Sequence, residues 1–492
     1  MLNLNELTIK QAAEGLRKEE FSSVELTEAV FGQIKKKDAD IHAFLSLDEE
    51  GALERAKEID EARSRGRDLN DLAGIPAAIK DTILVKGLKC TSASKILENF
   101  VAPYDATIIK KLKEAGAVFV GKTNLDEFAM GSSTENSAFG PTKNPCDLTR
   151  VPGGSSGGSA ASVAAQETIY ALGSDTGGSI RHPASFCGVV GLKPTYGAVS
   201  RFGLMAMASS LDQIGPLTKT VEDARIVFDA IKGRDPLDST SVESKIQNSK
   251  FKIQNLRIGM PREYFAEGID EEVEGLVKQA IFRFQEMGAK VKEVSLSHSD
   301  FALACYYIIM ASEVSANLAR YDGIKYGYSA ANNKQPARLD FVHAKSGGIA
   351  DNNLMGAYLK TRQEGFGDEV RRRIMLGTYS LSAGYYDAYY LAAQKVRTLI
   401  KNDFESAFRD VDVIMTPVSP TPAFKFGEKI EDPVKMYLSD IYTVSINLAG
   451  VPALSMNCGK IGDLPVGLQI IGPHAGEQII FETGLAYERS QN

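Results

Sequence analysis

Glycine and serine are concentrated, and charge is scarce, between residues 151 and 200. These 50 residues hold ten of the chain's 44 glycines and eight serines, and only four of them are charged, against 24% of the whole chain. Glycine in surface loops normally occurs together with charged residues. Its occurrence without charge therefore indicates backbone that is packed inside the protein or faces a bound ligand.

Two glycine-flanked turns in this segment, 152–159 and 173–181, carry serine hydroxyls. Consecutive backbone N–H groups in such turns can converge on a developing negative charge and form an oxyanion hole. The segment therefore predicts acyl transfer by a serine nucleophile. Such a serine needs a base within hydrogen-bond reach, because it is a weak nucleophile at its own pKa.

The sequence leaves two candidates for that base. The chain has five histidines, and His182 is the one close to Ser179, although the following proline disfavours helical backbone at His182. Lys80 ends the apolar run 75–79, and Asp81 need not pair with it because neighbouring side chains on a strand point to opposite faces. Burial beside neutral hydroxyls can lower a lysine pKa from ~10.4 to near 7. A lysine at a strand end is nevertheless more often a surface side chain.

The elements that must position these residues alternate between strand-length apolar runs and helical periodicity. We predict strands at 75–84, 117–120, 256–260, 290–296, 411–415, 453–457 and 466–471, and helices near 107–115 and 270–287. This alternation is typical of an α/β fold with a mixed sheet. Residues 1–70 are rich in charge and have the hydrophobic periodicity of helices, with a capping box at 22–25. They predict a helical cap that packs on a core of residues 71–492. The polar stretches 235–255 and 327–353 predict surface excursions within that core.

Composition restricts the partners of the chain. Fifty-six Lys and Arg stand against 63 Asp and Glu, a net charge of −7, which argues against a broad basic face for nucleic acid or an anionic membrane. Any RNA substrate would be handled mostly by a partner. No apolar run reaches the ~18 residues of a membrane span and the first 21 residues do not resemble a signal peptide, so we expect a soluble, cytoplasmic protein. The five cysteines are widely spaced, which argues against disulfides and a zinc site.

Four local motifs suggest other chemistries, and each lacks a required feature. Residues 116–123 fit the spacing of a phosphate-binding loop, but the intervening residues are typical of a strand, whose amides would be committed to a sheet. Residues 92–95 fit S-x-x-K without a Ser-Asp-Asn triplet elsewhere in the chain. Residues 154–158 fit G-x-S-x-G, but the downstream histidines have no distinctive setting. Cys187 has apolar neighbours, which favour an inert thiol.

Taken together, the motifs resemble those of the amidase signature family. The resemblance extends over nearly the whole chain and rests on four segments: Gly74-Ile75-Pro76, Lys80-Asp81, Gly153–Gly158 and Asp175–Arg181. It implies a single large mixed β-sheet core flanked by helices. It also implies a catalytic triad in which Ser179 is the nucleophile, Ser155 is a bridging serine after a cis peptide bond, and Lys80 is the terminal base. By the same match, the backbone N–H groups of Thr176, Gly177, Gly178 and Ser179 would bind the oxyanion.

Three further stretches are similar to the glutamine-hydrolysing A subunits of tRNA-dependent amidotransferases within this family. They run from Tyr306 to Gly323, from Arg371 to Thr378 and from Asp432 to Asp440. The resemblance implies that Arg373 holds the α-carboxylate of glutamine and Asp440 its α-ammonium group. Tyr306 is expected against the substrate, with the adjacent Tyr307 as the alternative register. Without the family, Arg373 would be interpreted as part of a solvated helix face and Asp440 as a helix cap.

The resemblance implies a glutaminase that releases ammonia for a separate B subunit. That subunit would activate Glu-tRNA(Gln) or Asp-tRNA(Asn) with ATP and Mg²⁺, and a small C subunit would brace the pair. No cofactor is expected on this chain. Two alternatives stay open: a stand-alone amidase that acts on other carboxamides, and a non-enzymatic scaffold subunit that has the fold without a working nucleophile.

Overall fold

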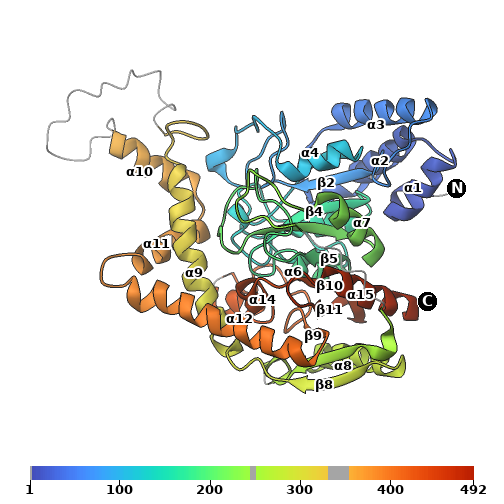
Figure 1. Cartoon of the computed structure of the whole chain (residues 1–492). Coiled ribbons are helices and arrows are strands. Elements are labelled where there is room, and N and C mark those ends of the chain that lie inside the picture. Colours follow the sequence, from blue (N-terminus) through green and yellow to red (C-terminus); the bar gives the residue numbers. More distant parts are fainter. Residues whose placement is uncertain (1–2, 244–250, 267, 331–353, 431, 492) are drawn as a thin grey trace.

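The fold is built on one mixed β-sheet with helices packed against it, as seen in a computed structural model (Figure 1). The structure describes residues 3–243, 251–266, 268–330, 354–430 and 432–491. Parts of both predicted polar excursions, 244–250 and 331–353, lie outside these ranges.

The described residues form eleven strands in the order β1-β3-β2-β4-β6-β5-β10-β11-β9-β7-β8. The strands are β1 Phe44–Leu47, β2 Pro76–Lys80, β3 Val118–Thr123, β4 Tyr170–Asp175, β5 Val190–Lys193, β6 Gln213–Thr218, β7 Arg257–Pro261, β8 Lys290–Val294, β9 Val413–Pro417, β10 Ala453–Ile461 and β11 Leu464–Ile471. β2 is parallel to β3 and β4, and β7 is parallel to β8 and β9, whereas the other pairs are antiparallel. The predicted fold class, a single large mixed sheet flanked by helices, is confirmed.

The described residues form fifteen α-helices, two of which coincide with the predicted helical segments near 107–115 and 270–287. They are α1 Ile9–Arg17, α2 Ser23–Ile41, α3 Glu49–Ser64, α4 Thr107–Glu114, α5 Gly157–Ala164, α6 Arg181–Cys187, α7 Val221–Ile231, α8 Glu271–Glu286, α9 Ala302–Asn317, α10 Leu354–Gly365, α11 Asp368–Ser380, α12 Ala392–Asp410, α13 Pro433–Tyr437, α14 Val444–Ala449 and α15 Glu477–Gln491. The predicted capping box at α2 is confirmed, because Ser22 Oγ accepts from the Glu25 N–H and the Glu25 carboxylate accepts from the Ser22 N–H.

The N-terminal region contributes to the sheet itself. Residues 3–70 hold α1, α2 and α3, and between the last two lies β1, which pairs antiparallel with β3 at one edge of the sheet. The sequence predicted only helices here, because β1 is a four-residue strand that leaves little periodicity to detect.

The helices α9 to α12 form an arm at the left of Figure 1. α9 packs against α11, α12 and α14. With its flanking turns, the stretch Ser299–Arg320 is long and apolar enough to cross a membrane, but half of it is buried inside the protein, as in a core helix. This arm carries residues that line the candidate site.

Candidate active site

Lys80 lies at the end of the interior strand β2 and is fully buried. Its Nζ is 2.8 Å from Ser155 Oγ and 2.8 Å from Ser156 Oγ, and 3.4 Å from the carbonyl oxygen of Ser174. Asp81, one residue later, points to the opposite face and pairs with Lys122 at 2.9 Å. The alternation of side chains along the strand thus separates Lys80 from the nearest carboxylate in sequence.

Burial governs the charge of Lys80. Desolvation of the amine lowers its pKa to about 7, and the more distant carboxylates Asp126, Asp175 and Asp212 oppose the shift only in part. The amine contacts hydroxyl and carbonyl oxygens instead of a carboxylate. A large fraction is therefore uncharged at neutral pH and can accept a proton.

Ser155 lies on a tight turn that precedes α5. The Gly154–Ser155 peptide bond is cis, and Thr134 ties the turn together by donating to the Gly153 carbonyl and accepting from the Gly157 N–H. A side chain at position 154 would place its Cβ 2.2 Å from Asp126 Oδ2, so only glycine fits there. The N–H of Ser156 donates to the carbonyl oxygen of Ser179 at 3.1 Å, which brings the two glycine-flanked turns side by side.

Ser179 lies on the turn between β4 and α6, and little of it is exposed (7%). The Asp175 carboxylate accepts from the N–H groups of Gly178 and Ile180 at 2.9 and 3.1 Å and pairs with Arg181 at 3.0 Å. Burial alone would raise the pKa of Asp175, but the Arg181 guanidinium outweighs burial and holds that pKa below its ordinary value. Asp175 therefore remains ionised and fixes the turn that carries Ser179.

Not all of the predicted oxyanion donors are available. The N–H of Gly178 is engaged by Asp175 Oδ1, which the sequence could not reveal because the acceptor is a side chain folded back onto the turn. In the described part of the chain, no acceptor contacts the N–H of Thr176, Gly177 or Ser179. Thr443 Oγ1 donates to the Gly177 carbonyl at 2.5 Å and so holds the Gly177–Gly178 peptide group.

The three predicted substrate-binding residues come from separate elements of the arm and the segment after α13. Arg373 lies on α11, Asp440 ends a short 3-10 turn at Leu438–Asp440, and Tyr306 lies on α9; all three are buried. Tyr306 packs against the turn 176–179, because a Cβ at Gly177 would lie 2.6 Å from its hydroxyl. Its neighbour Tyr307 donates to Asp440 Oδ2 at 2.8 Å, and the Arg373 guanidinium lies 5.4 Å from the Tyr307 ring centre.

Several residues around this clamp of Arg373, Asp440 and the tyrosine pair had no signal in the sequence. Glu369 accepts from Arg373 Nε at 2.7 Å and from the Tyr437 hydroxyl at 3.0 Å, and Ser132 donates to Asp440 at 2.8 Å. Only the i, i+4 spacing of Glu369 and Arg373 could have indicated one of these contacts. Burial disfavours the charged form of Arg373, but Glu369 and the neighbouring tyrosines together outweigh burial and raise the arginine pKa.

A cavity of about 190 Å³ lies beside Arg373, and Asp440 and the tyrosine pair are not among its lining residues. Among its lining residues are Arg373, Glu369, Tyr437, Lys429 and Ser133. Burial raises the pKa of Asp440 to about 6, and the hydrogen bonds from Ser132 and Tyr307 limit that rise. Asp440 is thus mostly anionic at neutral pH, and a cationic guanidinium and an anionic carboxylate flank the tyrosine pair.

His182 does not occupy the position of a base. It lies in the first turn of α6, where a proline at the third helical position is tolerated, so the expected exclusion from helical backbone is wrong. Its Nδ1 lies 3.3 Å from the Ser132 carbonyl oxygen, its ring packs on Phe186, and burial lowers its pKa to about 3. It is a buried neutral side chain behind the clamp.

The other local motifs serve structural roles. Residues 118–123 of the phosphate-loop spacing form β3, as predicted, and Lys122 is paired with Asp81. Cys187 is buried and its thiol pKa is raised by burial. Within the residues that the structure describes, no group of three His, Cys, Asp or Glu side chains could hold a metal ion.

Comparison with known proteins gives consistent matches over the whole chain. A family model described as Amidase matches residues 25–481. The A subunit of the glutamyl-tRNA(Gln) amidotransferase of Carboxydothermus hydrogenoformans is 54% identical, over 99% of this chain and 98% of that protein. The same-named protein of Caldanaerobacter subterraneus subsp. tengcongensis is 55% identical, over 99% and 97%. The crystal structure of the corresponding A subunit from Thermotoga maritima is 43% identical and superposes with a TM-score of 0.78, covering 98% of this chain and 94% of that one.

Proposed function

The chain belongs to the amidase family, and from this premise we propose that it is the glutamine-hydrolysing subunit of a tRNA-dependent amidotransferase. The observation that carries the proposal is a buried lysine amine, Lys80 Nζ, within 2.8 Å of the Ser155 hydroxyl oxygen. Histidine usually serves as the base of a serine nucleophile. Here, an uncharged lysine next to two hydroxyls supplies the same basicity.

The proposed reaction proceeds through an ester. Lys80 accepts the proton of Ser155, Ser155 accepts that of Ser179, and Ser179 Oγ attacks the side-chain carbonyl carbon of glutamine. The oxyanion is bound by the N–H groups of Thr176, Gly177 and Ser179, which have no competing acceptor in the described structure. As the C–N bond breaks, the proton passes back through Ser155 to the leaving nitrogen. Ammonia departs, and water then hydrolyses the glutamyl ester to glutamate and restores Ser179.

Recognition of glutamine is proposed to rest on Arg373 and Asp440. A guanidinium matches an α-carboxylate, and a carboxylate accepts from an α-ammonium group. Tyr307 links the two, since its hydroxyl contacts Asp440 and its ring lies under Arg373. Tyr306 would contact the substrate beside the oxyanion turn.

The ammonia is proposed to pass to a partner. The relatives are named as A subunits of an amidotransferase, which supports an assembly with B and C subunits. ATP and Mg²⁺ would be bound by the B subunit, and Glu-tRNA(Gln) or Asp-tRNA(Asn) would be held mainly by that subunit. The net charge of −7 agrees with limited contact between this chain and tRNA. The assembly would work in the cytoplasm.

The proposal is tested by co-expressing the chain with candidate B and C subunits. Purified assembly is supplied with glutamine, ATP, Mg²⁺ and mischarged Glu-tRNA(Gln), and formation of Gln-tRNA(Gln) is measured. We expect glutamine-dependent conversion that is lost when this chain is omitted and restored by free ammonium. The proposal would be contradicted if the complete assembly, with this chain present, formed Gln-tRNA(Gln) from ammonium but not from glutamine.

The acylation rate should rise with pH through about 7. Below that value Lys80 is protonated and cannot accept a proton, and above it the neutral amine predominates. The rate is measured in single turnovers at saturating glutamine, so that ionisation of Asp440, whose pKa is about 6, affects binding and not the measured rate. The relevant range is about one pH unit on each side of the Lys80 pKa, roughly pH 6 to 8. A rate that stays flat or falls over this range would argue against Lys80 as the base.

Arg373→Ala should raise the KM for glutamine about 100-fold and change kcat far less. Truncating one partner of a buried charged pair costs about 3 kcal/mol, and each 1.4 kcal/mol is tenfold in affinity. Hydrolysis of an amide without the α-carboxylate, such as 4-aminobutanamide, should be unaffected. Arg371→Ala is the matched control, because Arg371 is on the same helix but pairs with the exposed Asp368. An unchanged KM in Arg373→Ala would favour a stand-alone amidase with other substrates.

A further inference from the structure

We propose that Asp212 is a positioning residue for the oxyanion turn and acts through the Thr176 side chain. The inference rests on the proposed amide hydrolysis and adds a residue that does not touch the substrate. Asp212 precedes β6 and is 3% exposed. Its Oδ1 accepts from Thr176 Oγ1 at 2.7 Å, so a carboxylate from another segment holds the first residue of the turn 176–179.

The same carboxylate also fixes the loop that delivers it. It accepts from the N–H of Met207 at 2.9 Å and from that of Ala208 at 3.1 Å. Among the described residues, no Lys, Arg or His forms an ion pair with Asp212. A buried carboxylate without a cation is costly. Its hydrogen bonds offset part of that cost and tie its position to three donors.

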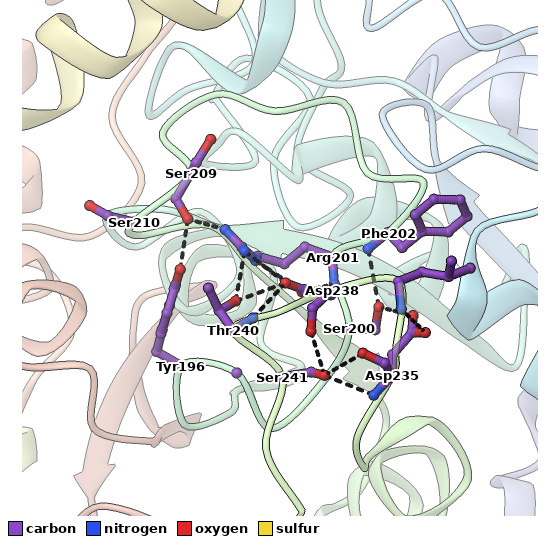
Figure 2. Close-up of polar contacts among 12 residues, drawn as sticks. Tyr196, Ser200, Arg201, Phe202, Ser209, Ser210, Asp235, Asp238, Thr240 and Ser241 are labelled. Carbon is purple, nitrogen blue, oxygen red and sulfur yellow. Dashed lines mark hydrogen bonds and ion pairs between the residues drawn. The ribbon is translucent and has the colours of Figure 1, made fainter.

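The loop 204–212 is itself anchored by a cluster of polar contacts (Figure 2). Arg201 pairs with Asp238 at 2.9 Å and donates to the Ser209 carbonyl, which also accepts from the Tyr196 hydroxyl at 2.8 Å. A cavity of about 210 Å³ lies beside Arg201, Ser209 and Asp212. The loop is therefore held on this side by polar contacts more than by close packing.

A second anchor joins the loop to the helical arm. The N–H of Ser210 donates to Glu313 of α9 at 2.8 Å, and Arg397 of α12 donates to the Ser210 carbonyl at 2.9 Å. Because the loop is anchored, the Asp212 carboxylate has a fixed position and in turn holds the Thr176 side chain. This matters because the turn continues into Gly177 and Gly178, and Gly178 has a φ of 144°. Glycine backbone has little conformational preference of its own, so the turn depends on such contacts for its shape.

The geometry of the turn is consequently set from two sides. Thr443 holds the Gly177 carbonyl and Asp212 holds the Thr176 side chain. Along the chain, the Gly177 N–H lies between these two contacts, and the Thr176 N–H belongs to the residue whose side chain Asp212 holds. Removing one contact leaves the donors present but less well aimed, and alignment errors of about 1 Å in a catalytic group can cost 10²-fold in rate.

Asp212→Ala tests the inference in the full-length chain, purified with its co-expressed partners. We expect kcat for glutamine to fall about 100-fold and KM to stay within about twofold. Thr176→Val, which removes only the hydroxyl, should lower kcat about tenfold. The double variant should match Asp212→Ala alone, because both substitutions break the same Thr176–Asp212 hydrogen bond. Effects that multiply, or a KM that rises as much as kcat falls, would overturn the inference.

Two further variants separate positioning from simple loss of structure. Asp212→Asn can donate its amide to Thr176 Oγ1 and still accept from the loop N–H groups, so kcat should stay within about fivefold of wild type. An asparagine variant as slow as alanine would overturn the inference, because geometry would then not be what Asp212 supplies. Asp229→Ala, at an exposed ion pair with Lys232, is the control for charge removal. An inactive wild-type assembly would instead disprove the proposed function.

Discussion

Ser179→Ala should lower the rate of glutamine hydrolysis by about four to six orders of magnitude while leaving glutamine binding nearly unchanged. Removing the nucleophile of a hydroxyl-based hydrolase costs a rate factor of up to about 2 × 10⁶, and the residual activity comes from the remaining site. The clamp residues are held by Tyr307 and Glu369 and not by the Ser179 hydroxyl, so the affinity for substrate should survive. Ammonia release in a coupled assay gives the rate, and glutamine binding is measured by calorimetry.

The nucleophile can also be identified directly. When the reaction with glutamine is quenched during turnover, mass spectrometry should detect a glutamyl ester on the peptide that contains Ser179. The Ser179→Ala variant should show no adduct. Ser162→Ala is the matched control, since Ser162 is also buried but donates only to the Ser159 carbonyl of its own helix. A Ser179→Ala variant with substantial activity, or an adduct on another serine, would support a scaffold role or a different nucleophile.

Part of the site is encoded locally and could be predicted from the residues themselves, whereas the roles of the triad and of the clamp were implied by the family resemblance. The glycine-rich turns lie in one segment, and strand alternation alone separates Lys80 from Asp81, which the Asp81–Lys122 pair confirms. The mixed sheet followed from the alternation of apolar runs and helical periods. In each case the determining information is a local pattern of residue types along the chain, such as the periods of about 2.0 and 3.6 residues in strands and helices.

What could not be predicted depends on contacts between distant segments. Asp212 contacts Thr176 from 36 residues away in the sequence, and Ser132 contacts Asp440 from 308 residues away. Nothing in the pattern around Asp212 marks it as different from a loop aspartate. The hydrogen bond from the Gly178 N–H to Asp175 was missed for a related reason. The sequence shows which residues form the turn, but it does not show that the Asp175 side chain folds back onto it.

Lys80→Met should reduce the acylation rate by about four to six orders of magnitude. Methionine fills a similar volume in the buried strand but cannot accept a proton, so Ser155 has no base behind it and Ser179 keeps its own proton. Loss of the base in a comparable hydrolase costs about as much as loss of the nucleophile. The pH dependence through about 7 should vanish with the lysine. The acylation rate is measured in single turnovers with quench-flow from pH 6 to 9, a range of about three units that covers the titration.

Lys193→Met is the control that separates basicity from burial. Lys193 is also buried, and burial lowers its pKa to about 7, but its Nζ donates to the Pro194 carbonyl and contacts no serine hydroxyl in the described structure. If catalysis needed only a desolvated amine in the core, the two variants would behave alike. Because the amine must stand within reach of Ser155 Oγ, we expect Lys193→Met to keep its acylation rate and its pH profile. Equal losses in both variants would mean that Lys80 supports the fold of the sheet and that another group deprotonates Ser179.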